Sequence, residues 1–299
     1  MNENNKGTFY IFLTLAMIAW GASWVHAKVL GNYITASELI VYRYAITIVS
    51  FIPVFIFLKK DLRIDMKNLF LAFVAAFFLT VYSIFYFNGV KYGTAGLGGA
   101  LVTTFTPILT FILLVSFFGK PFFKKDMFAL FLGGIGVLTI LNIWKFSSEE
   151  IFSLANINFI AACVFWAGLT ISNSKLTKVS PLVFTFYVYI FTAIMGYFMT
   201  SFESGDIFQF DWIFWLNLFS SALISTTFAT SMFFIAITKI GANEANSFIF
   251  LVPFNAIFLS FLFLGEDIYM TTILGTILTI IAVSIVNNIK IPKLFRKKI

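Results

Sequence analysis

Hydroxyl side chains cluster around a proline in the stretch GTAGLGGALVTTFTPILTF, residues 93–111, although the chain as a whole is 60% hydrophobic. Thr103, Thr106 and Thr110 follow helical spacing and share one helix face. Pro107 removes a backbone donor and frees a carbonyl one turn earlier. Such a face can hydrogen-bond a polar solute, so we predict a gate-and-cavity helix here. Ordinary helix packing and threonine-to-backbone bonding remain the alternative.

A matching pattern precedes a second proline, Pro253. Asn243, Asn246 and Phe250 approach it at the same spacing. Interruptions by Gly or Pro in corresponding spans point to a binding site near the membrane midplane. Pro107 and Pro253 are therefore the predicted hinges or kinks.

Other candidate contacts lie on further apolar stretches. Trp20 and Trp166 lie well inside their stretches, so lining a cavity, gating it or packing are all preferred to anchoring at the membrane interface. The predicted substrate contacts are Trp20, Ser23, Arg43, Tyr82, Thr103, Thr106, Trp166, Thr170, Asn246 and Phe250.

Arg43 is the one charge clearly inside an apolar stretch, roughly 9 Å from its outer end at the helical rise. An intramembrane arginine is a functional-site hypothesis by default. It could bind a substrate carboxylate, extend toward the interface, or hold Glu38 and nearby carbonyls. His26, the single histidine, is expected at the interface and exposed.

Carboxylates lie at the ends of the apolar stretches and not near their middles, as Glu244 and Glu266 illustrate. A proton pump built on intramembrane carboxylates is therefore disfavoured, which leaves facilitated diffusion, exchange, or coupling through Glu244 or His26. A strongly cationic drug would find no neutralising group. A neutral, zwitterionic or aromatic metabolite suits the lining better, and an amino acid is the simplest example.

Sequence motifs of catalysis are missing: there is no HExxH, no Walker loop and no GxSxG. The one cysteine, Cys163, is expected to be a small core residue. We therefore predict no enzyme activity, no catalytic residues, no metal and no cofactor.

The elements that must position these residues are long apolar helices. A helix needs about 20 apolar residues to cross a bilayer. Ten windows meet this demand, and the fold class is an all-α polytopic membrane protein. The windows are residues 8–28, 37–58, 68–89, 95–118, 126–144, 154–175, 181–201, 212–238, 243–264 and 269–288.

The positive charges orient these spans. With the N-terminus inside, sixteen of the 20 Lys and Arg fall in inside segments, and three fall outside at Lys28, Lys91 and Lys145. This bias predicts cytoplasmic termini in a multi-pass protein of the cell (inner) membrane. Nucleic-acid binding is not expected, because the basic residues are scattered among short loops.

The chain repeats itself after 146 residues: Trp20 corresponds to Trp166, and Pro107 to Pro253. The predicted halves are residues 1–147 and 148–299, with five spans each. Because five is odd, the second half must enter the membrane inverted, an arrangement typical of secondary transporters.

Three ordered motifs carry a family resemblance: WGASWVHAKVLGNYITASELIVYRYAI, GTAGLGGALVTTFTPILTF and GANEANSFIFLVPFNAIFLSFLFLGED. The chain resembles the EamA family of the drug/metabolite transporter superfamily over nearly its whole length. The resemblance implies a ten-helix exporter or exchanger with a cavity between the repeats. Family members often carry Gly-Glu after spans four and nine; here Gly265-Glu266 fits, whereas the first repeat has Gly119-Lys120.

We therefore expect an ATP-independent transporter that moves a small metabolite by alternating access, by export or exchange, as a monomer or homodimer. Two alternatives remain. A lipid-carrier flippase should show a cavity open to lipid and a cationic phosphate site. A non-transporting membrane scaffold should have dry polar faces.

Overall fold

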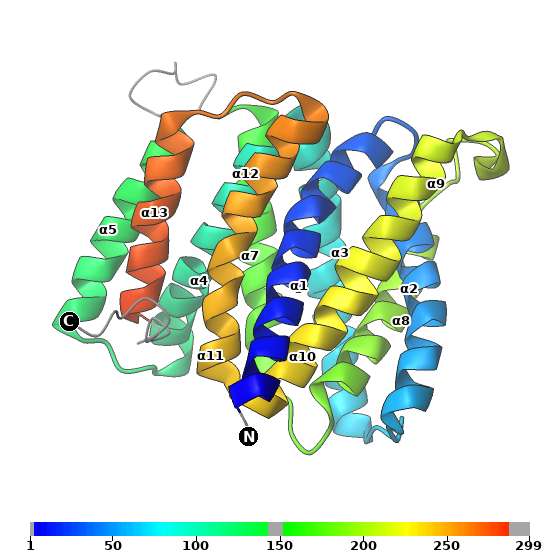
Figure 1. The fold of residues 1–299 in the computed structure, drawn as a ribbon, viewed down its shortest axis with the longest axis horizontal. Coiled ribbons are helices and arrows are strands. Elements are labelled where there is room, and N and C mark those ends of the chain that lie inside the picture. The colour runs from blue at the N-terminus through cyan, green and yellow to red at the C-terminus, as the bar shows by residue number, and fades with distance from the viewer. Residues whose placement is uncertain (1–2, 143–151, 287–299) are drawn as a thin grey trace.

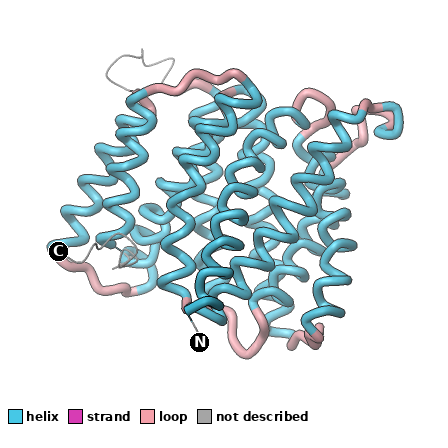
Figure 2. The backbone as a smooth tube through the Cα atoms, viewed as in Figure 1, coloured by secondary structure: helices cyan, strands magenta, loops and turns pink. Residues whose placement is uncertain are grey.

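The computed structural model describes residues 3–142 and 152–286, and every regular element in these ranges is a helix (Figures 1 and 2). Lys145 and the predicted boundary at residues 147/148 lie outside the described residues, as does the side chain of Asn243. The main helices are α1 (Glu3–Leu30), α2 (Ala36–Leu58), α3 (Met66–Tyr92), α4 (Ala95–Phe118), α5 (Lys124–Ile140), α7 (Leu154–Ser174), α8 (Pro181–Met199), α9 (Trp212–Phe219), α10 (Ala229–Ile240), α11 (Ala242–Ser247), α12 (Leu251–Leu264) and α13 (Met270–Val286).

Two of the membrane spans are composite. A π-helix, η2 (Ser220–Phe228), joins α9 to α10, and a 3₁₀ turn, η3 (Phe248–Phe250), joins α11 to α12. Counted as continuous rods, the described residues form ten helices. Eight are long and apolar enough to cross a membrane, and α13 is a shorter apolar helix. The prediction of an all-helical, multi-pass membrane protein is confirmed.

The rods form two central bundles between two flanking pairs (Figure 1). We call α1 with the α9–η2–α10 and α11–η3–α12 rods the α1 bundle, and α7 with α3 and α4 the α7 bundle. The α2–α8 pair flanks the bundles on one side and the α5–α13 pair on the other.

Equivalent helices of the two repeats pack on equivalent partners. Helix α3 packs on α7 as α10 and η2 pack on α1, and α4 packs on α7 as α12 packs on α1. Helices α1 and α7 run in opposite directions, because Lys28 near the end of α1 reaches Gly93, and Gly93 lies against Ala155 at the start of α7. This confirms two inverted five-helix repeats. We call the face where α1 begins the N-terminal face, and the face where α1 ends the opposite face.

Matched glycines end α4 and α12. Gly119 has φ 67° and Gly265 has φ 66°, in the left-handed region that glycine adopts without a Cβ penalty. Both helices therefore stop at the same register of the repeat. The residue after each glycine therefore occupies an equivalent position in the two repeats. It is Lys120 in the first repeat and Glu266 in the second.

Candidate functional site

The two bundles meet through aromatic side chains near the opposite face. Trp24 of the α1 bundle is buried, and its ring lies edge-on to Tyr86 of α3 at a centroid distance of 4.5 Å. It also contacts Phe159 of α7 at 6.2 Å. The Tyr86 hydroxyl donates a hydrogen bond to the Ser23 carbonyl at 2.8 Å. Together these contacts join the half of α1 near the opposite face to α3 and α7.

Glycines in the first turns of α4 allow this close approach. A Cβ added at Gly98 would lie 2.5 Å from the Phe159 ring, and one added at Gly99 would lie 2.3 Å from the Cβ of Ala256 on α12. Both separations are well below van der Waals contact. The glycine-rich start of the first motif is therefore a helix-packing feature at the junction of the two bundles.

A lysine closes the opposite face from the α1 side. The Lys28 ammonium donates hydrogen bonds to the carbonyls of Val90, Lys91 and Gly93, at 2.9, 3.1 and 2.6 Å. These carbonyls belong to the C-terminal end of α3, where helix carbonyls lack partners and the helix dipole favours a cation. All three ammonium donors can be used at once, so Lys28 caps α3 across the bundle junction.

A glutamate closes the same face from α12. The backbone N–H groups of Ala95 and Gly96 donate to the two carboxylate oxygens of Glu266 at 2.7 and 2.8 Å. These N–H groups are unpaired donors at the start of α4, where the helix dipole favours an anion. Glu266 therefore caps α4 from the other bundle. We call the contacts of Trp24, Gly99, Lys28 and Glu266 the seal.

The N-terminal face has no copy of these two caps at the repeat-related positions. Ser174 takes the place of Lys28, and its hydroxyl donates to the Ile171 carbonyl of its own helix at 2.6 Å. Lys120 takes the place of Glu266 and cannot accept a backbone N–H. Its ammonium lies 4.4 Å from the centre of the Phe111 ring, and burial lowers the pKa of Lys120.

Contacts near the N-terminal face stay within each bundle. Tyr10 donates a hydrogen bond to Glu244, which joins α1 to α11 inside the α1 bundle. Asn68 of α3 donates to the Thr177 carbonyl, just after α7. Among the described residues, the hydrogen bonds and ring contacts that join the α1 bundle to the α7 bundle all lie in the half near the opposite face.

The two predicted tryptophans take equivalent places below the seal. Trp20 packs on Phe233 of α10 at 5.2 Å, and Trp166 packs on Tyr82 of α3 at 4.5 Å. Trp20 is half-buried, whereas Trp166 is 37% exposed. Each bundle thus carries one Trp–aromatic pair, but no contact brings the two pairs together in this structure.

Several predicted hydroxyl contacts bond their own backbone. Thr103 donates to the Gly99 carbonyl at 2.5 Å, Thr170 to Trp166 at 2.9 Å, and Ser23 to Trp20 at 2.7 Å. A hydroxyl bonded in this way still offers its lone pairs to a solute. Of the other predicted contacts, Thr106 is buried on α4, and Asn246 and Phe250 are half-buried on the α11–η3–α12 rod.

The two prolines affect their helices differently. Helix α4 continues as α-helix through Pro107. Pro253 instead follows the 3₁₀ turn η3, which separates α11 from α12 one turn before the proline. The helical geometry therefore changes one turn before Pro253 and does not change at Pro107.

Arg43 lies at the junction of α2, α3 and η2. Its guanidinium donates from Nε and Nη2 to the Thr226 hydroxyl at 3.1 and 3.0 Å, and lies 6.0 Å from the Phe87 ring centre. Glu38 is engaged elsewhere, with Thr35 and Ser204, so the suggested Arg43–Glu38 contact is wrong. The expectation for His26 is also wrong, because it is half-buried and its Nδ1 lies 2.8 Å from the Asn217 amide oxygen.

Comparison with known proteins identifies the class. Residues 7–142 and 153–288 each match the EamA-like transporter family, so the chain belongs to that family and consists of two EamA repeats. It is a multi-pass membrane transporter rather than an enzyme, which confirms the resemblance and the expectation of no enzyme activity.

Relatives extend over almost the whole chain. The uncharacterized transporter YyaM of Bacillus subtilis is 24% identical, over 95% of both chains. The uncharacterized transporter YetK of the same organism is 26% identical, over 89% of this chain and 82% of the relative. An uncharacterized transporter of Archaeoglobus fulgidus is 26% identical, over 92% and 95%. A solved crystal structure shares the fold, with a TM-score of 0.62 and 14% identity over 94% of this chain and 98% of the other.

Proposed function

We propose that the chain is an ATP-independent secondary transporter that works by alternating access, and that the structure represents its inward-facing state. The observation that carries this proposal is the one-sided junction: in the described part of the chain, hydrogen bonds and ring contacts join the bundles near the opposite face and not near the N-terminal face. If each inverted repeat adopted the conformation that the other has in this structure, the N-terminal face would close and the opposite face would open.

The orientation follows from charge. On the N-terminal face the described loops and helix ends carry Lys6, in the first turns of α1, and ten further cations, against Lys28 and Lys91 on the opposite face. The ten are Lys59, Lys60, Arg63, Lys67, Lys120, Lys124, Lys125, Lys175, Lys178 and Lys239. Positive residues favour the cytoplasm, so we place the N-terminal face and both termini there. The seal then faces the outside of the cell membrane.

The flanking pairs supply the pivots for such a motion. Helices α2 and α8 stay in contact from Ile40 against Gly196 near one face to Phe55 against Phe186 near the other. Helices α5 and α13 also pack closely, with Gly136 against Thr279 and Gly133 against Ala282. Each pair joins counterpart helices of the two repeats, so the bundles can rock between them without separating.

We place the substrate site between the two Trp–aromatic pairs, below the seal, because these pairs take equivalent positions in the two repeats. Trp20 and Trp166 offer apolar faces and N–H donors, and the lone pairs of the Thr103 and Thr170 hydroxyls complete a neutral lining. Among the described residues no carboxylate lies near the middle of a span. This lining supports a small neutral, zwitterionic or aromatic solute, with an amino acid as the first candidate. Arg43 lies toward the outside and could receive a carboxylate in the outward-facing state.

Export is the direction supported by the unequal caps. Lys28 and Glu266 stabilise the state closed to the outside, whereas Ser174 and Lys120 give no equivalent help to the state closed to the cytoplasm. The empty carrier then rests open to the cytoplasm, where a metabolite can load. We further propose that the two functional halves are residues 1–147 and 148–299.

Uptake into proteoliposomes with pooled amino acids and nucleosides tests the function. Substrate-dependent exchange without ATP is expected, and it should be lost when the bundles are crosslinked across the seal. Lipid scrambling without movement of any solute would instead support the flippase. Cysteines placed at Lys91 and Lys239 in the Cys163→Ala background should label from opposite sides, and labelling of both from one side would contradict the orientation.

A further inference from the structure

We propose that a groove between α2 and α8 at the N-terminal face is a binding site for one anionic phospholipid. The groove has a volume of about 290 Å³. It lies on a flanking pair, away from the seal and from the tryptophan pairs, so the proposal does not depend on what the protein transports. Its lining residues are Ile52, Phe55, Ile56, Lys59, Lys60, Leu62 and Phe186.

The wall of the groove is apolar and faces outward. Ile52 is 50% exposed and Ile56 is 72% exposed, while Phe55 and Phe186 form a buried base with ring centres 5.0 Å apart. From Ile52 to Lys59 the helix rises by roughly 10 Å. The first part of an acyl chain can lie along this length, and the exposed isoleucines face hydrocarbon rather than water in a membrane.

The rim of the groove is cationic. Lys59 and Lys60 are both exposed, and in the described part of the chain neither has an acidic partner. The neighbouring carboxylate, Asp61, is directed at Arg63 instead. It accepts the Arg63 backbone N–H at 3.0 Å and lies 3.8 Å from the guanidinium Nε. Two positive charges therefore remain at the end of the span, at headgroup depth, where they complement a phosphate.

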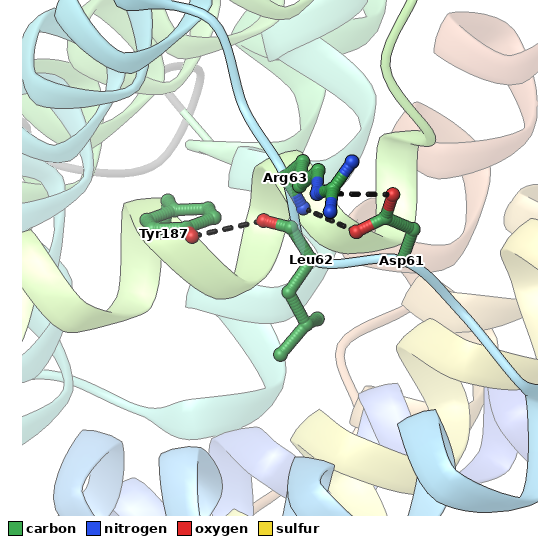
Figure 3. A network of polar contacts seen from close by, with 4 residues as sticks. All are labelled: Asp61, Leu62, Arg63 and Tyr187. Atoms are coloured by element: carbon green, nitrogen blue, oxygen red, sulfur yellow. Dashed lines mark hydrogen bonds and ion pairs between the residues drawn. The ribbon is translucent and has the colours of Figure 1, made fainter.

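The loop that forms the outer edge of the groove is fixed in place. The Tyr187 hydroxyl of α8 donates to the Leu62 carbonyl at 2.9 Å (Figure 3). Backbone N–H groups of Lys59 and Lys60 donate to Ile56 and Phe55 at 3.2 and 3.1 Å. The groove is thus formed before a ligand arrives, which lowers the entropic cost of binding.

An anionic phospholipid matches both halves of the site, because its acyl chain fits the apolar wall and its phosphate fits the lysine rim. A soluble anion would leave the exposed isoleucines uncovered, and a zwitterionic lipid would leave a positive charge near the lysines. The occupied groove would join α2 to α8, the counterpart helices of the two repeats, and so brace a pivot of the proposed motion.

The test uses the purified full chain in nanodiscs that contain mostly phosphatidylcholine and a small share of phosphatidylglycerol. Native mass spectrometry counts the lipids that stay bound after the protein is released from the nanodisc. One phosphatidylglycerol per chain is expected. The double variant Lys59→Gln/Lys60→Gln should lower its apparent affinity about 30-fold, the effect of two interfacial cations.

Matched variants separate the groove from general surface charge. Lys178→Gln/Lys239→Gln removes two exposed lysines from the same face, and Lys178 shares the left-handed backbone of Lys59, with φ 60° and 48°. This double variant should bind phosphatidylglycerol as well as the parent protein does. Ile56→Trp should fill the groove and displace the lipid with both rim lysines present. Phe57→Trp, at the neighbouring exposed position, should not displace it. The proposal would be overturned if both double lysine variants lost bound phosphatidylglycerol equally. It would also be overturned if Ile56→Trp kept all of its bound phosphatidylglycerol.

Discussion

Glu266→Gln is the most direct test of the seal. Glutamine keeps the size and one carbonyl oxygen of the glutamate but loses the charge and the second acceptor. In the structure each carboxylate oxygen receives one N–H from the start of α4. The substitution therefore leaves one of these two donors without its partner and removes the favourable interaction with the helix dipole.

The size of the effect can be worked from these contacts. A hydrogen bond to a charged group contributes about 1.5–3 kcal/mol, and a charge at a helix N-terminus about 0.3–1 kcal/mol. Glu266 is half-buried, so solvent screening reduces both values. We expect the sealed state to lose about 1.5 kcal/mol, which is roughly a tenfold rise in the population open to the outside.

The assay measures access from outside the cell. In a Cys163→Ala background, Thr103→Cys places a thiol one turn below Gly99 and beneath the seal. A membrane-impermeant maleimide added to intact cells labels this cysteine in proportion to the outward-open population. Labelling should be about ten times faster in Glu266→Gln.

Asp267→Asn is the matched control, since Asp267 is the next residue along the chain, is exposed, and makes no hydrogen bond to α4 in the described structure. Its labelling rate should equal that of the parent. If Asp267→Asn accelerates labelling as much as Glu266→Gln, net charge and not the helix cap holds the seal. If neither variant changes the rate, the reasoning about the closed face is refuted.

Three further outcomes are expected. Lys28→Met removes three ammonium hydrogen bonds and should also speed labelling of the reporter cysteine from outside several-fold. Lys91→Met, at an exposed lysine of the same face, should leave the labelling rate unchanged. Gly99→Val should lower the apparent melting temperature in detergent and favour the outward-open state, because its side chain would overlap α12, whereas Gly134→Val has open space and should be mild. Trp166→Ala should raise the KM for the transported solute at unchanged protein abundance, measured by proteoliposome exchange, and an unchanged KM would remove this residue from the site.

Hydrophobic patterning was enough to predict the architecture. A bilayer admits few alternatives to helices, so ten apolar windows with a 146-residue repeat predict ten rods in two inverted halves. The composite spans were not predictable in the same way. The residue types in SSALISTTF do not distinguish a π-helix from an α-helix. The contact that Thr226 makes with Arg43, 183 residues away in the sequence, was likewise not readable from the segment itself.

The candidate site was only partly accessible from sequence. Residue type and spacing pointed to Trp20, Trp166 and Tyr82, and the structure places the last two in contact. The roles of Lys28 and Glu266 were missed, because a charge at the end of a span is usually a topology signal or a solvated group. The sequence does show that Lys120 and Glu266 differ at equivalent positions of the two repeats. Predicting a helix cap from this difference also required knowing which helix end each residue faces.

The asymmetry of the caps has a consequence for the transport cycle. Two inverted repeats of identical sequence would give the inward- and outward-facing states equal free energy, so any preference must arise where the repeats differ. Lys28 and Glu266 add contacts across the junction to one state, whereas the Tyr10–Glu244 contact stays inside one bundle and need not break when the bundles rock. In the proposed cycle, opening to the outside breaks both caps, and bound substrate has to offset that loss through contacts that exist in the outward-facing state. We expect outward opening, rather than return of the empty carrier, to limit the rate of export. Glu266→Gln should then raise the maximal export rate, and a lower maximal rate in a folded variant would place the slow step elsewhere.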